Sequence, residues 1–330
     1  MSVDGLDRAF AAFDRHLLRR LPERVAIPVG QWGLRLLPLD RLGLFRHADP
    51  RLAISLGGVA LPNPVILSSM YYDTAILQRA MGLGFGAVTA KTITRHPRPG
   101  HPPPNVVRAV SPEGPGLVNC NGFHNPGLAA YRGALARLPH RVPLIVSAAG
   151  DSAEEYAEVA AGLAPFGDLV ELNISSPNTR LVYEWSRKPA ELEGLFRAVR
   201  AATDKPLIVK VSPDFREVNE DAIVPAALAT GIGIVNAGNT HRIEEPRLSQ
   251  KSGGLSGPAI FPAMLDNVHR LRKRFGSEVQ IIATGGIDTP IKALAALDAG
   301  ATACAYFTAF VTRGPLLARR ICDALVARLR

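Results

Sequence analysis

The chain alternates short apolar runs with segments in which apolar residues recur at helical spacing. The short runs are rich in β-branched residues, the pattern of strands buried on both faces, and from about residue 52 onward they alternate with amphipathic segments. Strands are predicted at residues 65–67, 87–90, 144–147, 169–173, 207–211, 232–236, 279–284 and 302–307. Helices are predicted at residues 76–81, 153–163, 189–202, 220–229, 262–275, 291–298 and 316–329. Eight strands in this rhythm predict an α/β fold, a (β/α)₈ TIM barrel, rather than an open sheet.

Residues 1–50 precede this alternation, and we interpret them as an amphipathic helical extension to a barrel of residues 51–330. Apolar residues recur beside arginines over 5–21 and again over 32–45, which predicts two short basic helices. Such helices could lie on a membrane surface, cap the bottom of the barrel or form a subunit contact in a homodimer. A small hairpin is expected at residues 52–61.

The composition limits which partners and which cellular locations are expected for the protein. The 330 residues carry 38 basic and 29 acidic side chains, a formal charge of 38 − 29 = +9. Nucleic acid is not an expected partner, because no binding motif with interleaved aromatics occurs and aromatics are only 6% of the chain. No apolar run approaches the roughly 20 residues that span a bilayer, and no signal peptide is recognisable. We therefore expect a cytoplasmic protein, or one bound peripherally to the inner face of the cell membrane. The three cysteines lack metal-ligand spacing, so neither a metal site nor a disulfide is expected.

Small and polar residues stand at the carboxyl ends of the predicted strands. In a (β/α)₈ barrel the active site lies at these ends. The most pronounced case is the segment 168–179, in which a buried strand opens into Asn-Ile-Ser-Ser-Pro-Asn-Thr. Together the strand ends suit a planar, polar, phosphate-bearing ligand. They carry Ser68, Ser69, Lys91, Ser147, Asn173, Lys210, Asn236, Thr284, Gly285, Gly286 and Thr308.

Glycines and lysines indicate an anionic ligand. Gly254 and Gly257 follow the sixth strand and Gly285 with Gly286 follows the seventh, where unhindered backbone N–H groups can approach a phosphate. Lys91 and Lys210 should point into the barrel mouth. A buried lysine is costly without an anion, although a lysine at a strand end can also extend to solvent.

Amide side chains and one serine complete the candidate chemistry. Asn119, Asn173, Asn178 and Asn236 each offer a donor and an acceptor and could surround a polar heterocycle. Ser176 is the reactive-looking group among them. No serine hydrolase motif surrounds Ser176, so a role as general acid or base is the alternative to a plain turn residue.

Seven motifs occur in order over most of the chain. They are Lys91-Thr-Ile-Thr with Pro97-Arg-Pro-Gly, Leu117-Val-Asn-Cys-Asn-Gly-Phe-His-Asn-Pro-Gly, Asn173-Ile-Ser-Ser-Pro-Asn-Thr, Val209-Lys-Val-Ser-Pro, Val235-Asn, Gly253-Gly-Leu-Ser-Gly-Pro and Thr284-Gly-Gly-Ile. With these motifs, residues 52–325 resemble the dihydroorotate dehydrogenase family. The motifs are specific for the family and less specific for the substrate.

The resemblance implies a barrel that holds FMN and oxidises dihydroorotate to orotate by hydride transfer, with a quinone as a candidate electron acceptor. In the family the base occupies the position of Ser176, and a serine there is similar to the membrane-associated, quinone-using class. The resemblance implies that the substrate is bound by Asn119, Asn121, Gly122, Phe123, Asn173, Asn178 and Asn236. It implies that FMN is bound by Ser68, Ser69, Lys91, Thr92, Asn119, Ser147, Asn173, Lys210, Asn236, Gly254, Gly257, Thr284, Gly285, Gly286, Phe307 and Thr308.

The match to the family is mixed. The loop 67–73 lacks the Gly-Leu-Asp-Lys pattern of the membrane class, and Lys91 is similar to the soluble class, whereas the amino-terminal helices resemble the membrane class. Residues 180–187 replace the family's Pro-Gly lid, and Cys120-Asn121 replaces the usual residues of the loop expected to meet the substrate carboxylate. An alternative is therefore a related flavin oxidoreductase that acts on another cyclic amide or dihydropyrimidine. A non-catalytic membrane-surface protein would leave the strand-end chemistry unexplained.

Overall fold

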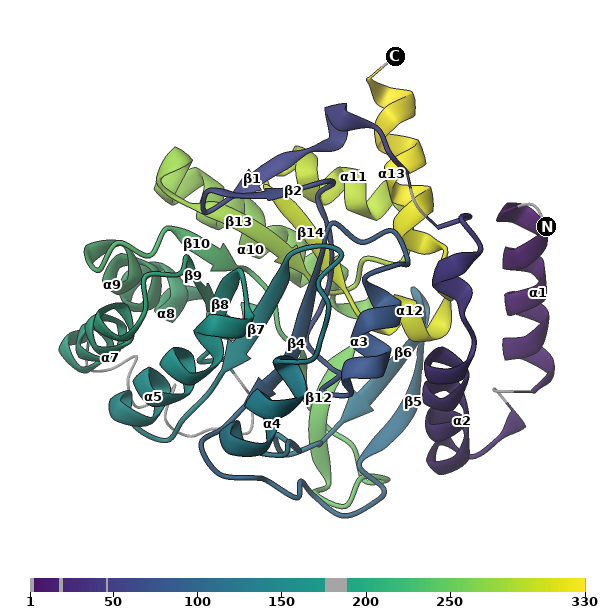
Figure 1. Cartoon of the computed structure of the whole chain (residues 1–330), viewed down its shortest axis with the longest axis horizontal. Coiled ribbons are helices and arrows are strands. Elements are labelled where there is room, and N and C mark those ends of the chain that lie inside the picture. Colours follow the sequence, from purple (N-terminus) through teal and green to yellow (C-terminus); the bar gives the residue numbers. More distant parts are fainter. Residues whose placement is uncertain (1–2, 18–19, 46, 176–188, 330) are drawn as a thin grey trace.

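A computed structural model describes residues 3–17, 20–45, 47–175 and 189–329 (Figure 1). Its centre is a closed barrel of eight parallel strands, which confirms the predicted fold class. The strands are β3 (Val65–Leu67), β4 (Ala87–Ile93), β7 (Leu144–Ala148), β8 (Leu169–Asn173), β9 (Leu207–Lys210), β10 (Ile234–Asn236), β13 (Gln280–Thr284) and β14 (Ala303–Tyr306). They follow one another around the barrel in chain order, and β14 closes it by pairing with β3.

Side chains alternate between the inside and the outside of the barrel. In β8, Val170 and Leu172 pack outward into the core beneath the helices, whereas Leu169 points inward. The inside cluster also contains Ile66, Ala87, Ile145, Ile208, Ile234, Ile282, Ala303 and Ala305. Because both faces of each strand are buried, the strands appear in the sequence as mainly apolar runs and not as an alternation of apolar and polar residues.

Helices cover the outside of the barrel (Figure 1). They are α3 (Thr74–Ala80), α4 (Leu128–Leu135), α5 (Ala153–Leu163), α7 (Pro189–Ala202), α8 (Arg216–Val218), α9 (Val224–Ala229), α10 (Phe261–Phe275), α11 (Pro290–Asp298), α12 (Thr308–Thr312) and α13 (Leu317–Arg328). The side chains of Asp73, Ser152 and Thr289 accept hydrogen bonds from backbone N–H groups at the starts of α3, α5 and α11. The predicted helix over 220–229 begins as a π-helix, Asn219–Ile223, before α9.

A hairpin of β1 (Ile54–Leu56) and β2 (Val59–Leu61) closes the amino end of the barrel, as the sequence predicts. Leu56 and Leu61 join the inside cluster. Gln280, at the first position of β13, links the hairpin to the barrel through two hydrogen bonds. Its side-chain N–H donates to the Ser55 carbonyl at 2.8 Å, and its side-chain oxygen accepts from Gly57 N–H at 2.7 Å. The floor of the barrel is therefore sealed.

A second, antiparallel sheet lies at the carboxyl end of the barrel, in segments where no strand was predicted from the sequence. Its order is β11 (His241–Glu244), β12 (Ser252–Ser256), β6 (Gly114–Asn119) and β5 (Val106–Ser111). Glycine, serine and proline are frequent in β6 and β12, and these residues disfavour strands in sequence-based prediction. Packing overrides this preference, because Val107, Val118, Cys120 and Leu248 form a small core on one face of the sheet.

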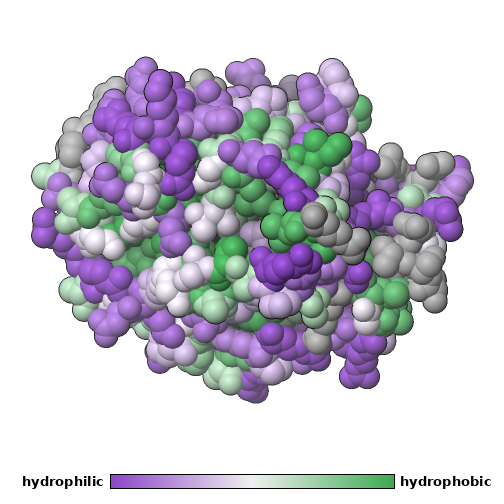
Figure 2. All heavy atoms as spheres, turned by 90° about the horizontal axis from the view of Figure 1, so that it is seen from above, coloured by the Kyte–Doolittle hydropathy of each residue, from purple (hydrophilic) through white to green (hydrophobic). Residues whose placement is uncertain are grey.

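The amino-terminal extension consists of α1 (Val3–His16), α2 (Glu23–Leu36) and a short turn, Leu39–Arg41, at the right of the barrel in Figures 1 and 2. The prediction of a second helix over 32–45 is wrong for most of that range. Pro22 precedes the observed helix, Leu37 ends it, and Pro28 lies inside it, although proline is uncommon in a helix interior. Within the described ranges no helix is both long and apolar enough to cross a membrane.

Ion pairs hold the extension against the barrel. Asp40, whose side chain is fully buried, binds Arg79 of α3 at 2.9 Å and Arg141 before β7 at 2.7 Å. Burial alone would raise the pKa of Asp40, but hydrogen bonds from the two arginines outweigh it and lower this pKa below its ordinary value. At the other end of the extension, Asp7 pairs with Arg320 of α13 at 2.7 Å.

We expect Asp40→Asn to lower the free energy of unfolding by about 2–4 kcal/mol, because two arginines lose a buried counter-charge. Urea unfolding followed by circular dichroism measures the change. Asp298→Asn, which breaks an exposed pair with Arg328, is the matched control and should cost less than about 1 kcal/mol. Equal effects of the two substitutions would contradict the conclusion that the buried ion pairs of Asp40 hold the extension against the barrel.

Candidate active site

A layer of polar side chains lies inside the barrel, between the apolar cluster and the carboxyl ends of the strands. Because inward positions recur every second residue, the inward isoleucines Ile145, Ile208, Ile234 and Ile282 are followed two residues later by Ser147, Lys210, Asn236 and Thr284. All four polar residues are buried. The same alternation in β8 places Glu171 and Asn173 inward, after Leu169. The sequence predicted all of these residues except Glu171.

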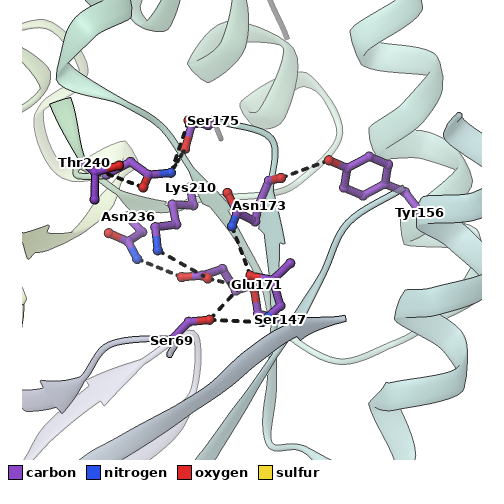
Figure 3. Close-up of polar contacts among 11 residues, drawn as sticks. Ser69, Ser147, Tyr156, Glu171, Asn173, Ser175, Lys210, Asn236 and Thr240 are labelled. Atoms are coloured by element: carbon purple, nitrogen blue, oxygen red, sulfur yellow. Dashed lines mark hydrogen bonds and ion pairs between the residues drawn. The ribbon is translucent and has the colours of Figure 1, made fainter. Parts of the chain in front are cut away.

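Glu171 is the central acceptor of this layer (Figure 3). It is 2% exposed. Its carboxylate accepts hydrogen bonds from Ser147 Oγ at 2.9 Å and Asn236 Nδ2 at 2.8 Å, and it lies 3.8 Å from Lys210 Nζ. Four adjacent strands, β7 to β10, therefore meet at one carboxylate. Glu171 was not predicted from the sequence because it lies inside an apolar run, although its position two residues after the inward Leu169 predicts an inward side chain.

A chain of hydrogen bonds links this carboxylate to β4 and to the loop after β3. Ser147 Oγ lies 3.0 Å from Thr92 Oγ1, which also accepts from Asn173 Nδ2 at 3.0 Å. Ser69 Oγ accepts from the Thr92 backbone N–H at 3.1 Å. On the outside, Tyr156 of α5 donates to the Asn173 carbonyl at 2.9 Å and fixes the end of β8 (Figure 3). These contacts hold the predicted site residues in one arrangement.

Lys91 lies within β4, at a register shift between Thr89 and Thr92, and not after the strand as the sequence analysis expected. Lys91 lines the large cavity at the barrel mouth, and within the described ranges its side chain has no hydrogen-bond or ion-pair partner. Burial, reinforced by the charge of Lys210, lowers the pKa of Lys91 from 10.5 to about 8. A cation held in this way favours an anionic ligand.

Several buried oxygen atoms at the strand ends also lack partners among the described residues. They are Ser68 Oγ, Asn173 Oδ1, Asn236 Oδ1 and Thr284 Oγ1, and they belong to four different strands or strand ends. Each of the two asparagines uses its N–H₂ group within the protein and leaves its carbonyl oxygen unused. Buried polar atoms are normally hydrogen-bonded, so these oxygens mark places for donors of a ligand.

A cavity of about 1110 Å³ opens beside these groups and continues to the amino-terminal extension. Its wall at the barrel mouth includes twelve of the predicted residues: Ser68, Ser69, Lys91, Asn119, Asn121, Lys210, Gly257, Thr284, Gly285, Gly286, Phe307 and Thr308. Thr92, Ser147, Asn173 and Asn236 belong to the hydrogen-bonded layer that adjoins this wall. Gly122, Phe123 and Gly254 do not line the cavity.

Glycines form the part of the wall next to β13. Gly286 has a φ of +71°, and a Cβ atom there would lie 2.5 Å from the backbone nitrogen of Phe261. Gly257 has a φ of +104°, and a Cβ atom there would lie 2.7 Å from Gly116 Cα. Thr308 donates to Ser256 Oγ at 2.8 Å across the same region. The backbone conformation and the close packing both exclude larger residues, so backbone N–H groups stay accessible to an anion.

The remaining predicted residues lie in the loop after β6 or outside the described ranges. Gly122 and Phe123 belong to that loop, which His101 fastens through a 2.7 Å contact with the Cys120 carbonyl. Asn119 donates to the Gly254 carbonyl at 3.3 Å and so links β6 to β12. Ser176, Asn178 and the lid 180–187 lie outside the residues that the structure describes.

Comparisons with known proteins show which family and which solved structures this chain is similar to. A family model described as dihydroorotate dehydrogenase matches residues 51–329. The dihydroorotate dehydrogenase (quinone) of Kineococcus radiotolerans is 32% identical, and the match covers 98% of this chain and 97% of that protein. The protein of the same name from Sphingopyxis alaskensis is 36% identical over 88% of this chain and 86% of that protein. The structure of DHODH from Eimeria tenella in complex with ferulenol superposes with a TM-score of 0.81 at 27% identity, covering 93% of this chain and 92% of that chain.

Lys91 should make the stability of the ligand-free protein depend on pH. The lowered pKa means that the unfolded chain binds a proton more tightly than the folded chain, so stability falls as the pH is lowered from about 10.5 to 8. We expect Lys91→Met to abolish this fall and to stabilise the ligand-free protein by about 1–3 kcal/mol at pH 7.5. Urea unfolding at pH 7.5 and 10 measures both effects.

The exposed Lys273 of α10 provides the control, since Lys273→Met should leave the pH dependence of wild type in place. A Lys91→Met protein whose stability follows pH as wild type does would contradict the assignment of the lowered pKa to this lysine.

Proposed function

The chain belongs to the dihydroorotate dehydrogenase family, and from this premise we propose that it oxidises dihydroorotate to orotate with bound FMN and passes the electrons to a quinone. The observation that carries the proposal is the set of unmatched polar groups at the barrel mouth. Among the described residues, Lys91 and two of the four buried oxygens without donors, Ser68 Oγ and Thr284 Oγ1, belong to residues that line one cavity, and the other two oxygens lie in the layer that adjoins its wall. A polar heterocycle with N–H groups and an acidic group satisfies both kinds of group.

The residues at the barrel mouth fit FMN. Lys91 and Lys210 would hold its anionic or electron-rich parts, and the oxygens of Asn173 and Asn236 would accept hydrogen bonds from ring N–H groups. Backbone N–H groups at Gly285 and Gly286, with Thr308, would bind its phosphate. When bound, the flavin supplies two-electron chemistry, because it takes a hydride from the substrate and later releases the electrons to an acceptor.

The protein's own part in the reaction is to orient two rings and to move one proton. Oxidation of dihydroorotate removes a hydride from one carbon and a proton from its neighbour. Ser176, three positions after Asn173 in the sequence, is the proposed base for that proton. The hydrogen-bonded layer from Ser69 to Glu171 would keep the flavin-binding residues fixed during this step, and such preorganisation lowers the barrier by avoiding rearrangement.

The extension is proposed to guide the acceptor. The cavity continues from the barrel mouth to side chains of α1 and α2, among them Phe10, Phe13, Ile27 and Trp32. An apolar ring such as a quinone suits such a wall. Large apolar side chains are also exposed on the extension: Trp32 is 68% exposed and Leu36 55%. We propose that this surface contacts the membrane from which the quinone enters.

Anaerobic mixing of the purified, yellow protein with L-dihydroorotate tests the substrate. We expect bleaching of the flavin band near roughly 450 nm, a property of the cofactor itself. Ser176→Ala should keep the flavin but slow the bleaching by about 10²-fold or more, because the proton loses its acceptor. A flavin band that dihydroorotate leaves unchanged would exclude this substrate and direct the search to other dihydropyrimidines and cyclic amides.

Sedimentation with anionic vesicles tests the membrane contact. We expect the double substitution Trp32→Ser and Leu36→Ser to weaken vesicle binding by roughly tenfold or more, because two apolar side chains no longer enter the interface. Ile291→Ser is the matched control, since Ile291 is 77% exposed but belongs to α11. Binding that is insensitive to both variants, or equally sensitive to both, would argue against the extension as the contact surface.

A further inference from the structure

Glu171 is a buried charge at the centre of the residues proposed to hold the flavin. It contacts Ser147, Lys210 and Asn236, which all belong to that set. In the proposed reaction Glu171 acts only as a member of the hydrogen-bonded layer, and its negative charge has no role. A buried carboxylate is costly even when paired, and a neutral side chain could also accept hydrogen bonds from Ser147 and Asn236. The negative charge itself therefore requires an explanation.

The positive charges around the cavity explain the negative charge of Glu171. Lys91 and Lys210 both line the cavity, and the charge of Lys210 contributes to the lowered pKa of Lys91. Glu171 is the carboxylate beside this pair, 3.8 Å from Lys210 Nζ, and Lys91 has no such partner within the described ranges. Two lysines and one glutamate leave a net charge of 2 − 1 = +1 at this place instead of +2. In a buried site such a difference is only weakly screened.

We propose that Glu171 is a positioning residue that holds Lys210 and Asn236 in place and sets the net positive charge next to the flavin, and thereby its reduction potential. The inference rests on the proposed function, since it presupposes that the barrel mouth binds a flavin. Positive charge near the ring favours the electron-rich, reduced form. Without the carboxylate the flavin would accept electrons from the substrate more readily, but it would deliver them less readily to a quinone. Glu171 balances the two half-reactions.

Sulfite binding to the oxidised protein reports this charge without turnover. Sulfite adds its lone pair to an oxidised flavin ring and bleaches the flavin band, and the resulting negative charge is stabilised by nearby cations. We expect Glu171→Gln to bind sulfite at least tenfold more tightly than wild type and to have a more positive reduction potential. Glu171→Asp, which keeps the charge, should lie closer to wild type than Glu171→Gln does.

The control for a general effect of losing a buried glutamate is Glu220→Gln. Glu220 is 9% exposed and binds Arg270, and it does not line the cavity. This variant should leave sulfite affinity and potential unchanged. Unchanged sulfite affinity in a flavin-containing Glu171→Gln protein would overturn the proposal, as would an equal change in Glu220→Gln.

A second variant keeps the test decisive if Glu171→Gln does not retain flavin. Lys210→Met removes one of the two positive charges and lowers the net charge at this place to 1 − 1 = 0, so sulfite affinity should fall at least tenfold, opposite to the effect of Glu171→Gln. Equal or tighter sulfite binding by Lys210→Met would overturn the proposal. Failure of the proposal for Glu171 can be distinguished from failure of the proposed function. In the second case the wild-type protein itself would lack flavin or resist reduction by dihydroorotate.

Discussion

A carboxylate that water cannot reach must be surrounded by donors, and this requirement governs the mouth of the barrel. Glu171 meets it with a hydroxyl from β7, an amide from β10 and an ammonium group from β9. Each of these partners comes from a different strand, so the arrangement exists only when the barrel is closed and its strands are in register. The hydrogen bonds then extend to Thr92, Ser69 and Asn173. The geometry of the site is thus a consequence of the fold as a whole.

Strand periodicity explains why much of this site could be predicted from the sequence. Once a run such as Leu207–Lys210 is recognised as a doubly buried strand, its inward residues follow from alternation, and the last of them is polar. Glu171 obeys the same rule but was overlooked, because the apolar residues around it dominate the pattern. Alternation is a stronger guide than hydropathy at such a position.

Other features could not be predicted in this way, for physical reasons. In the sheet of β5, β6, β11 and β12, the strands β6 and β12 are rich in residues of low strand propensity, and they pair with each other across more than 130 residues of sequence. The helix α2 contains Pro28, and its position depends on packing against α3 and β5, which a local pattern does not contain. The register shift that directs Lys91 into the cavity likewise depends on its neighbour β7.

The closure of the barrel between its first and last strands has a consequence for how the protein is made. Residues 65–67 pair with residues 304–306, and the amino-terminal hairpin packs on Ile234 and Ile282. During synthesis on a ribosome, β3 therefore waits with one edge unpaired until nearly the whole chain has emerged. Contacts between such distant residues slow folding and leave apolar strand edges exposed in the meantime. The nascent chain is accordingly the state in which this protein most needs protection by chaperones.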